Sequence, residues 1–347
     1  MKDNSTKKFY LAVSLIILGT FFLLPNHTFA QTKIFENLVY MTNDQKGIKS
    51  FKNNAKYIDI IAPQSYTLNY DLDVVGSVPD EIKNIAKDNK VKVMPLIVNA
   101  NFNQALIHKL LISSTTIQKR IIDYLVTEAI KNNYVGWQFD FEHIYYTDRD
   151  SYSTFIETTS KAFKDNGLSL SIAAVSRSND IVTDHYKNWE GAFDYERISK
   201  SVDFISIMTY DDPNSNGPVA SMPFVVGVYE YLKDKIPPQK LSLGVPFYYW
   251  GWSVSPSIKV RPNGTYERLA WLRQTYHVVE GFSDVYKIPF LKYSIGKKQY
   301  VVWHEDAKSL AFKLNLVKEN NLRGISAWKL GMENPSVWTA LYDIIKK

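Results

Sequence analysis

Two carboxyl groups, spaced one residue apart, close an otherwise apolar stretch, Tyr134 to Glu142 (YVGWQFDFE). At the two-residue period of a β-strand, Asp140 and Glu142 share one face, about 6–7 Å apart along the strand. Gln138 precedes them on that face. The opposite face is wholly apolar and carries Val135, Trp137, Phe139 and Phe141. Neighbouring carboxyl groups raise one another's pKa, so that one keeps a proton it can donate while the other is ionised. The pair indicates acid–base catalysis, and a structural ion pair is the alternative interpretation.

A second polar strand end lies in the stretch Phe204 to Asp212 (FISIMTYDD). By alternation Met208 and Tyr210 face together, and Asp211 begins the following loop. Aspartate, proline and asparagine are all turn formers, so a solvated turn is the plain interpretation of Asp211 to Asn214. We favour a functional site, because the tyrosine stands at the end of a second strand.

Aromatic residues follow two further strand candidates. Tyr248 and Trp250 come directly after one of them, and Trp328 ends another. Sugar rings stack their CH faces on aromatic surfaces, whereas core packing under a loop is the common alternative for each residue alone. Their coincidence at several strand ends favours a carbohydrate site.

These strand ends belong to a regular alternation of apolar stretches and helical patterns, which predicts a (β/α)8 TIM barrel. In such a barrel the carboxyl ends of all strands meet at one face, where active sites lie. The predicted strands are Asn37 to Met41, Ile58 to Pro63, Val91 to Val98, Val135 to Phe141, Leu168 to Val175, Phe204 to Met208, Leu241 to Pro246 and Gly324 to Ala327.

Two helices and one insertion complete the predicted barrel. A stripe of Ile117, Ile121, Leu125 and Ala129 predicts a helix before the acidic strand, and Asp150 is expected to cap the next helix, which ends at Asn166-Gly167. Residues 253–320, between the seventh and eighth strands, exceed an ordinary crossover. Within them, Lys287 to Trp303 predicts a hairpin, and a helix is expected from about Asp306.

Composition limits the chemistry. The 347 residues are 45% hydrophobic, include no cysteine, and place six histidines without metal-ligand spacing. Cysteine nucleophiles, disulfides and thiolate metal sites are excluded by this composition. The sequence has no run of basic residues of the kind that binds nucleic acid. It also has no glycine-rich phosphate-binding loop, which disfavours a barrel enzyme that acts on phosphates. The chain is expected to act as a monomer.

The first 30 residues predict a secretory signal peptide. Lys2, Lys7 and Lys8 precede an apolar run from Phe9 to Leu24, and a cleavage site follows Ala30. Because the run is shorter than a membrane span, we expect export without a stable membrane anchor, and one folded domain over residues 31–347. Removal of residues 1–30 lowers the formal charge from +6 to +4. An anionic cell-wall surface suits this mild positive charge.

The sequence around the two carboxyl groups resembles the strand-four signature of glycoside hydrolase family 18, the chitinase-like hydrolases, which runs Asp-Gly-x-Asp-x-Asp-x-Glu. Gly136, Asp140 and Glu142 match it, whereas Val135 and Gln138 stand where the family has aspartates. The Met208-x-Tyr210-Asp211 motif, Trp328 and an insertion between strands seven and eight are also similar to the family. Ala62 to Tyr66 and Met208 to Ser221 resemble its spore-cortex and cell-wall branch.

The resemblance implies hydrolysis of an N-acetylglucosamine-containing polysaccharide without a metal or an organic cofactor. Glu142 is implied as the proton donor, and Asp140 is implied to hold the substrate acetamide. Tyr210 and Asp211 are implied to contact the same sugar, and Trp328 to lie beneath its ring. Gln138, Met208, Tyr248 and Trp250 are expected to bind substrate, and the Gln138 amide is expected to donate to Asp140, keeping that carboxylate ionised at lower pH. We expect a wall glycan such as peptidoglycan as substrate. Chitin oligomers and a catalytically silent chitinase-like lectin are the alternatives.

Overall fold

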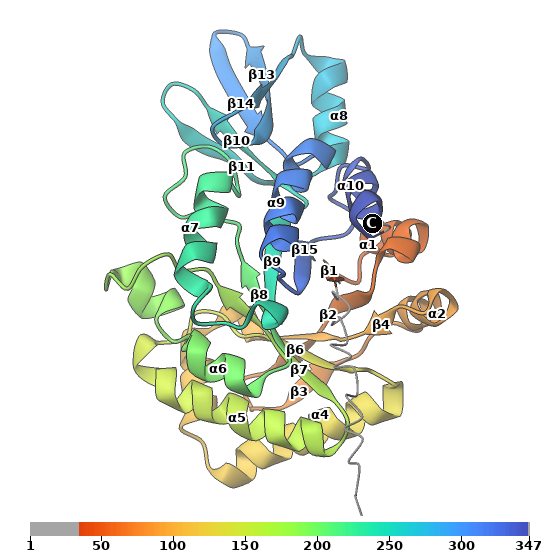
Figure 1. Ribbon diagram of the computed structural model, residues 1–347, viewed down its shortest axis with the longest axis vertical. Coiled ribbons are helices and arrows are strands. Elements are labelled where there is room, and N and C mark those ends of the chain that lie inside the picture. Colours follow the sequence, from red (N-terminus) through yellow and green to blue (C-terminus); the bar gives the residue numbers. More distant parts are fainter. Residues whose placement is uncertain (1–34, 346–347) are drawn as a thin grey trace, which may run out of the picture. The chain divides into compact units, whose positions relative to one another are not determined.

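The protein, a computed structural model that describes residues 35–345, contains a closed barrel of eight parallel strands (Figure 1). The first strand pairs with both the second and the last, which closes the ring. The predicted (β/α)8 fold is confirmed. The predicted signal peptide lies outside the described residues. The barrel strands are β1 (Glu36–Met41), β2 (Ile60–Leu68), β5 (Leu96–Asn99), β6 (Gly136–Asp140), β7 (Ser169–Val175), β8 (Phe204–Met208), β9 (Leu241–Pro246) and β15 (Gly324–Trp328).

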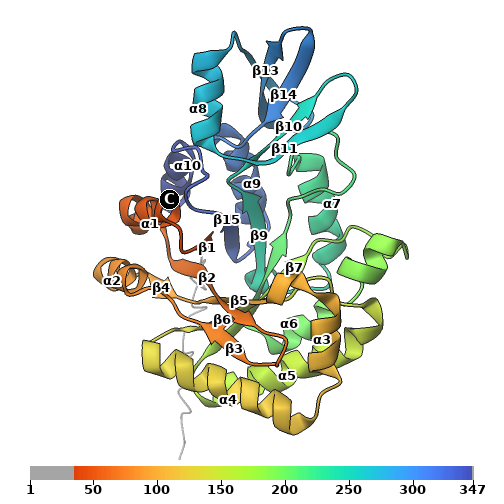
Figure 2. The same cartoon turned by 180° about the vertical axis from the view of Figure 1, so that it is seen from behind.

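Helices surround the barrel, and α4, α5 and α6 lie side by side along its outside (Figures 1 and 2). Two short strands, β3 (Val74–Gly76) and β4 (Lys92–Val93), pair with β2. No helix among residues 35–345 is both long and apolar enough to cross a bilayer. The helices are α1 (Gln45–Asn54), α2 (Asp80–Asn89), α3 (Gln104–Leu111), α4 (Thr115–Asn132), α5 (Arg149–Asp165), α6 (Tyr195–Ser201), α7 (Met222–Leu232), α9 (Ala307–Glu319) and α10 (Val337–Ile345).

Helix α5 begins two residues earlier than predicted. Its N-cap residue is Asp148, so Asp150 lies inside the first turn and the prediction that it caps the helix is wrong. A 3₁₀ turn over Tyr146–Asp148 leads directly into the helix. The Asp148 carboxylate does not cap the helix and instead lies 2.9 Å from the His108 ring nitrogen Nδ1.

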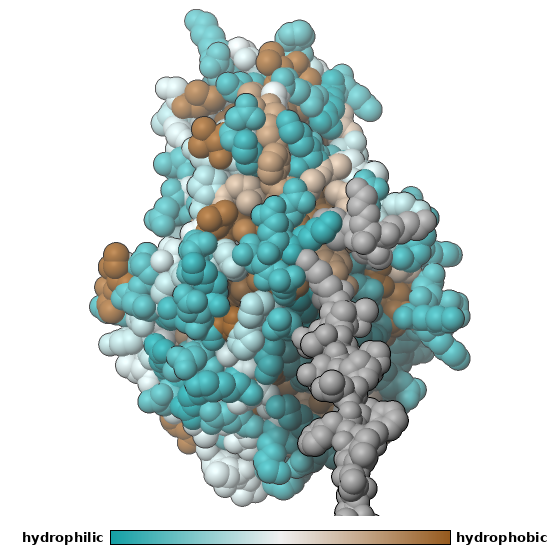
Figure 3. Space-filling model, in the orientation of Figure 1, coloured by the Kyte–Doolittle hydropathy of each residue, from teal (hydrophilic) through white to brown (hydrophobic). Residues whose placement is uncertain are grey.

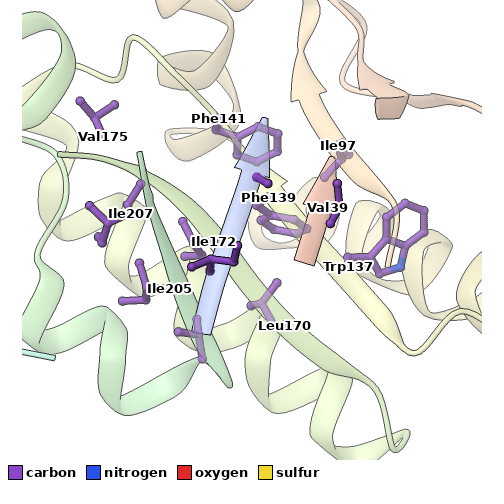
Figure 4. Packing of buried hydrophobic residues seen from close by; sticks show 14 of the residues in the cluster. Val39, Ile97, Trp137, Phe139, Phe141, Leu170, Ile172, Val175, Ile205 and Ile207 are labelled. Atoms are coloured by element: carbon purple, nitrogen blue, oxygen red, sulfur yellow. The ribbon is translucent and has the colours of Figure 1, made fainter. Parts of the chain in front are cut away.

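Strand β6 separates the two environments that its sequence predicts. Trp137 and Phe139 are fully buried in the layer between strands and helices, together with Phe141 (Figure 4). The Trp137 indole nitrogen donates to the Leu125 carbonyl of α4 at 2.9 Å, which fixes the strand against that helix.

Val135 is an exception to this alternation. It packs against an apolar cluster inside the barrel that includes Leu38, Leu96 and Phe204. The prediction that it shares the outer face is therefore wrong. The cause is Gly136, whose φ of +154° departs from an ordinary strand. A Cβ at Gly136 would lie 1.8 Å from the Ser169 carbonyl oxygen, so only glycine permits this close approach of β6 to β7.

The barrel interior carries a chain of buried polar side chains below the carboxyl groups. The Gln138 amide donates to the Ser206 hydroxyl at 2.8 Å. Ser206 and Ser326 are 2.7 Å apart, and so are Ser326 and Ser242. The chain links β6, β8, β15 and β9 across the interior, so these strands are held by hydrogen bonds as well as by apolar packing.

An α+β insertion lies between β9 and β15, as predicted, at the end of the molecule that the upper parts of Figures 1 and 2 show. The predicted hairpin is β13 and β14, and Asp306 caps the helix that follows, α9. On the face that Figure 3 shows, hydrophobic residues lie on this insertion, whereas hydrophilic residues predominate lower down. The insertion comprises β10 (Tyr249–Ser253), β11 (Ile258–Gly264), α8 (Tyr266–Thr275), β12 (Val279–Ser283), β13 (Ile288–Ile295) and β14 (Lys298–Trp303).

Candidate active site

A cavity of about 610 Å³ opens at the carboxyl ends of the barrel strands, beside the insertion. Its walls come from the ends of β1, β2, β6, β7, β8, β9 and β15 and from β10 and β11 of the insertion. The structure brings together here eight of the residues that the sequence selected: Asp140, Glu142, Met208, Tyr210, Asp211, Tyr248, Trp250 and Trp328.

Gln138 is the one selected residue that does not line the cavity. It is fully buried, and its amide nitrogen donates to Ser206 instead of Asp140. The prediction that Gln138 contacts the substrate therefore needs correction, because the side chain lies one layer deeper in the barrel than Asp140. Its expected hydrogen bond to Asp140 is also absent from the contacts of the described residues, in which Asp140 Oδ1 is buried without a partner.

Burial raises the pKa of both carboxyl groups. The pKa of Asp140 rises to about 7 because the side chain, 5% exposed, is removed from water without a compensating charge. The pKa of Glu142 rises well above its ordinary value, first through burial and then through the charges of Asp140 and Asp211. Such a pair titrates jointly, and the form with one proton predominates between its two pKa values.

Asn99, at the end of β5, holds the backbone of Glu142. Its side-chain oxygen accepts from the Glu142 amide at 3.1 Å, and its side-chain nitrogen donates to the Glu142 carbonyl at 3.2 Å. The same nitrogen donates to the Asn103 carbonyl at 3.1 Å. Because Glu142 lies two residues beyond β6, these bonds replace the strand pairing that would otherwise fix its position.

Tyr210 and Tyr248 form the wall next to Asp211. Their rings pack edge to face, with centroids 6.3 Å apart. Burial raises the pKa of Asp211, and interactions with the Tyr248 hydroxyl and the charge of Lys259 oppose that shift. The backbone of Asp211 has a φ of +57°, a conformation that aspartate adopts more readily than most residues and that turns the chain away from β8.

Several cavity residues were not selected from the sequence. Tyr40 lies on β1 with its ring 5.4 Å from that of Trp328, and its buried hydroxyl has no partner among the described residues. Alternation with Leu38 along the first predicted strand could have identified it. Phe102 and Trp189 lie in short helical turns, Ala100–Phe102 and Tyr186–Glu190, and Lys259 lies in the insertion, where periodicity gives no signal.

Metal-ligand geometry does not occur at this site: residues 35–345 contain no cluster of three or more histidine, aspartate or glutamate side chains that could hold a metal ion. The chemistry available here is that of two carboxyl groups sharing one proton, beside a tyrosine hydroxyl and indole surfaces.

Comparison with known proteins identifies the family. The family model of the glycosyl hydrolases family 18 matches residues 27–333. The chain belongs to this family. It is therefore a glycoside hydrolase.

Similar proteins include a glycosylase and cortex-lytic enzymes of Bacillus species. An uncharacterized glycosylase of Bacillus subtilis, YvbX, is 28% identical over 342 residues, which cover 95% of this chain and 97% of that protein. The cortical fragment-lytic enzyme of B. subtilis is 29% identical over 282 residues, 77% of this chain and 64% of that enzyme. The crystal structure of the spore cortex-lytic enzyme SleL of Bacillus megaterium QM B1551 has a TM-score of 0.78 at 26% identity and covers 89% of this chain and 73% of that chain.

The contacts of Asn99 lead to a prediction about this family 18 site. Asn99→Ala removes both bonds to the Glu142 backbone and should lower kcat by about 10-fold or more with a smaller change in KM, because small displacements of a reacting group are costly. Asn103→Ala is the control. The Asn103 side chain caps α3, so its loss should cost about 1 kcal/mol of stability and leave kcat nearly unchanged. Steady-state kinetics with melting curves separates the two, and equal kcat values for both variants would contradict the positioning role.

Proposed function

We propose that the chain hydrolyses β-1,4 bonds on the reducing side of N-acetylglucosamine, with the substrate's own acetamido group as nucleophile. The observation that carries this proposal is the pair of buried carboxyl groups, Asp140 and Glu142, whose pKa values are both raised at the wall of one cavity. Some glycosidases use the acetamido oxygen in place of a second enzyme carboxylate. One donor acid and one charge-stabilising carboxylate are then sufficient.

In the proposed reaction Glu142 donates its proton to the glycosidic oxygen as the bond to the anomeric carbon breaks. The acetamido oxygen attacks that carbon from the opposite side and forms a positively charged oxazolinium ion, while Asp140 holds the acetamide N–H. The Tyr210 hydroxyl fixes the acetamide oxygen, and Trp328 supports the sugar ring. Glu142 then takes a proton from water, which opens the oxazolinium ion and gives a product with retained configuration.

This mechanism requires ionised Asp140 and protonated Glu142 at the same time. Activity should therefore rise with pH as Asp140 loses its proton near pH 7, and fall again when Glu142 is deprotonated.

A substitution at Gln138 tests the rise of activity on the acidic side of the pH profile. Gln138→Asp places a second carboxyl group directly below Asp140, and repulsion between the two should move the acidic limb of kcat/KM upward by on the order of one pH unit. Gln138→Asn shortens the side chain without adding charge and serves as the control. If the pH profiles of wild type and Gln138→Asp superimpose, position 138 is not coupled to the reaction.

Peptidoglycan or a related wall glycan is the substrate that we propose. The names of two relatives, both cortex-lytic or cortical fragment-lytic enzymes, support it, as do the mild positive charge and the predicted signal peptide, from which we also propose export. Chitin oligomers are the second candidate, because the aromatic wall at Tyr248 and Trp250 suits an uncharged glycan equally well. A silent lectin is disfavoured by the retained acid–base pair.

Analysis of the new reducing ends tests the substrate. Purified wall glycan and chitin oligosaccharides are digested, reduced with borohydride and examined by mass spectrometry. N-acetylglucosaminitol from wall glycan is the expected product. Reduced N-acetylmuramic acid, or cleavage of chitin alone, would overturn the substrate proposal. If neither glycan is cleaved, the catalytically silent lectin becomes the better explanation.

A further inference from the structure

Lys259, on β11 of the insertion, is the only lysine or arginine among the described residues that line the cavity. Its ammonium group lies over the indole of Trp250, 2.9 Å from the ring centroid, and 5.0 Å from that of Trp252. Within the described part of the chain no carboxylate oxygen lies within 4.0 Å of it. The cation is thus held by aromatic faces and keeps its hydrogen-bond donors for another partner.

The charged groups near Lys259 are carboxylates. Asp211 and Asp212 lie close enough to favour its charged form, whereas partial burial lowers its pKa. Asp140 and Glu142 line the same cavity. A half-buried cation that forms no ion pair with these carboxyl groups is costly unless it serves a ligand or balances their field from a distance.

Lys259 and the proposed proton donor come from different parts of the cavity wall. Glu142, which must face the leaving group, follows β6 and is tied to the end of β5 by Asn99. Trp250 and Lys259 follow β9 in the chain, and β9 pairs with β15, which carries Trp328. In the proposed reaction the sugar that carries the attacking acetamide lies over Trp328, and Lys259 lines the same cavity, so we assign it to a neighbouring sugar of the glycan.

We propose that Lys259 binds the carboxylate of a 3-O-lactyl substituent on a sugar next to the N-acetylglucosamine at the cleaved bond. This inference rests on the proposed function. In a wall glycan N-acetylglucosamine alternates with N-acetylmuramic acid, so both neighbours of the N-acetylglucosamine at the cleaved bond are muramic acids. Chitin has no carboxylate there. Lys259 is then a specificity residue that selects muramyl strands over chitin.

The test uses one glycan in two charge states. Wall glycan strands freed of peptide carry free lactyl carboxylates, and coupling with methylamine converts them to neutral amides. Wild type should have a kcat/KM about 10- to 100-fold higher on the acid than on the amide, mostly through KM, as expected for a charge-assisted hydrogen bond. Lys259→Gln should bring that ratio close to one, and Lys259→Arg should restore it.

Lys292→Gln is the matched control, because Lys292 is an exposed lysine of the same sheet that also lies by an aromatic ring, 5.0 Å from the Phe290 centroid, outside the cavity. It should keep the wild-type ratio. Melting curves check that each variant is folded.

The outcomes separate this inference from the proposed function. If wild type cuts both strands at equal rates, or Lys259→Gln slows both equally, Lys259 only balances protein charges and the inference is wrong while the hydrolase stands. If wild type cuts chitin and neither strand, the proposed substrate and the inference both fail.

Discussion

Replacing Glu142 with glutamine should lower kcat by about 10² to 10⁴, the usual contribution of general acid catalysis. Glutamine keeps the shape of the side chain but has no proton to give to the glycosidic oxygen. The backbone bonds from Asn99 do not depend on the side chain, so the loop should stay in place. Glycan binding, measured by calorimetry, is expected to survive the substitution.

Glu196→Gln is the control for that experiment, because Glu196 is an exposed surface residue of α6 that pairs with Lys200. It should have wild-type kinetics. Unchanged turnover in Glu142→Gln would remove Glu142 as the proton donor and with it the proposed mechanism.

Asp140→Asn should lower kcat by about 10² to 10³ and at the same time stabilise the fold. A neutral amide cannot offset the positive charge that develops toward the oxazolinium ion, and preorganised charges of this kind contribute on that scale. It also no longer repels the charged form of Glu142, so the pKa of Glu142 should fall. The kinetic loss comes from charge, since asparagine has nearly the same shape.

The stability gain follows from linkage. The folded chain binds a proton on Asp140 up to about pH 7, whereas the unfolded chain releases it near pH 4. Ionisation of Asp140 therefore costs stability as the pH rises through that window, by at most about 4 kcal/mol above pH 7. The Tm of Asp140→Asn should exceed that of wild type at pH 8, and the difference should vanish below pH 4. A lower Tm at pH 8 would show that Asp140 is stabilised by a partner.

Alternation along strands was sufficient to locate most of this site. Asp140 and Glu142 were assigned to one face, and Met208 and Tyr210 to another strand end, because a two-residue period and a parallel barrel together determine which side chains meet. Trp328 was selected because it ends a predicted strand and resembles a tryptophan of family 18. The barrel itself was predictable because each strand is a short apolar run followed by a helical pattern.

Depth and long-range contacts were not predictable in this way. Periodicity assigned Gln138 to the correct face but could not show that it lies below the cavity floor and bonds to Ser206, 68 residues away. Asn99 and Lys259 reach the site through a side-chain clamp and through an insertion, which no local pattern describes. Asp150 was misassigned as a cap because a 3₁₀ turn and an α-helix join without a break.

The buried chain of Gln138, Ser206, Ser326 and Ser242 also bears on how this barrel can evolve. Each member satisfies a neighbour, so an apolar replacement of Ser326 alone would leave the Ser242 hydroxyl without its partner inside the barrel, at a cost of about 1–3 kcal/mol, and Ser206 with only Gln138. Replacing the whole set together by packed apolar residues avoids that cost. The four positions are therefore epistatic, and homologous sequences should change them as a group, even though they lie on four different strands.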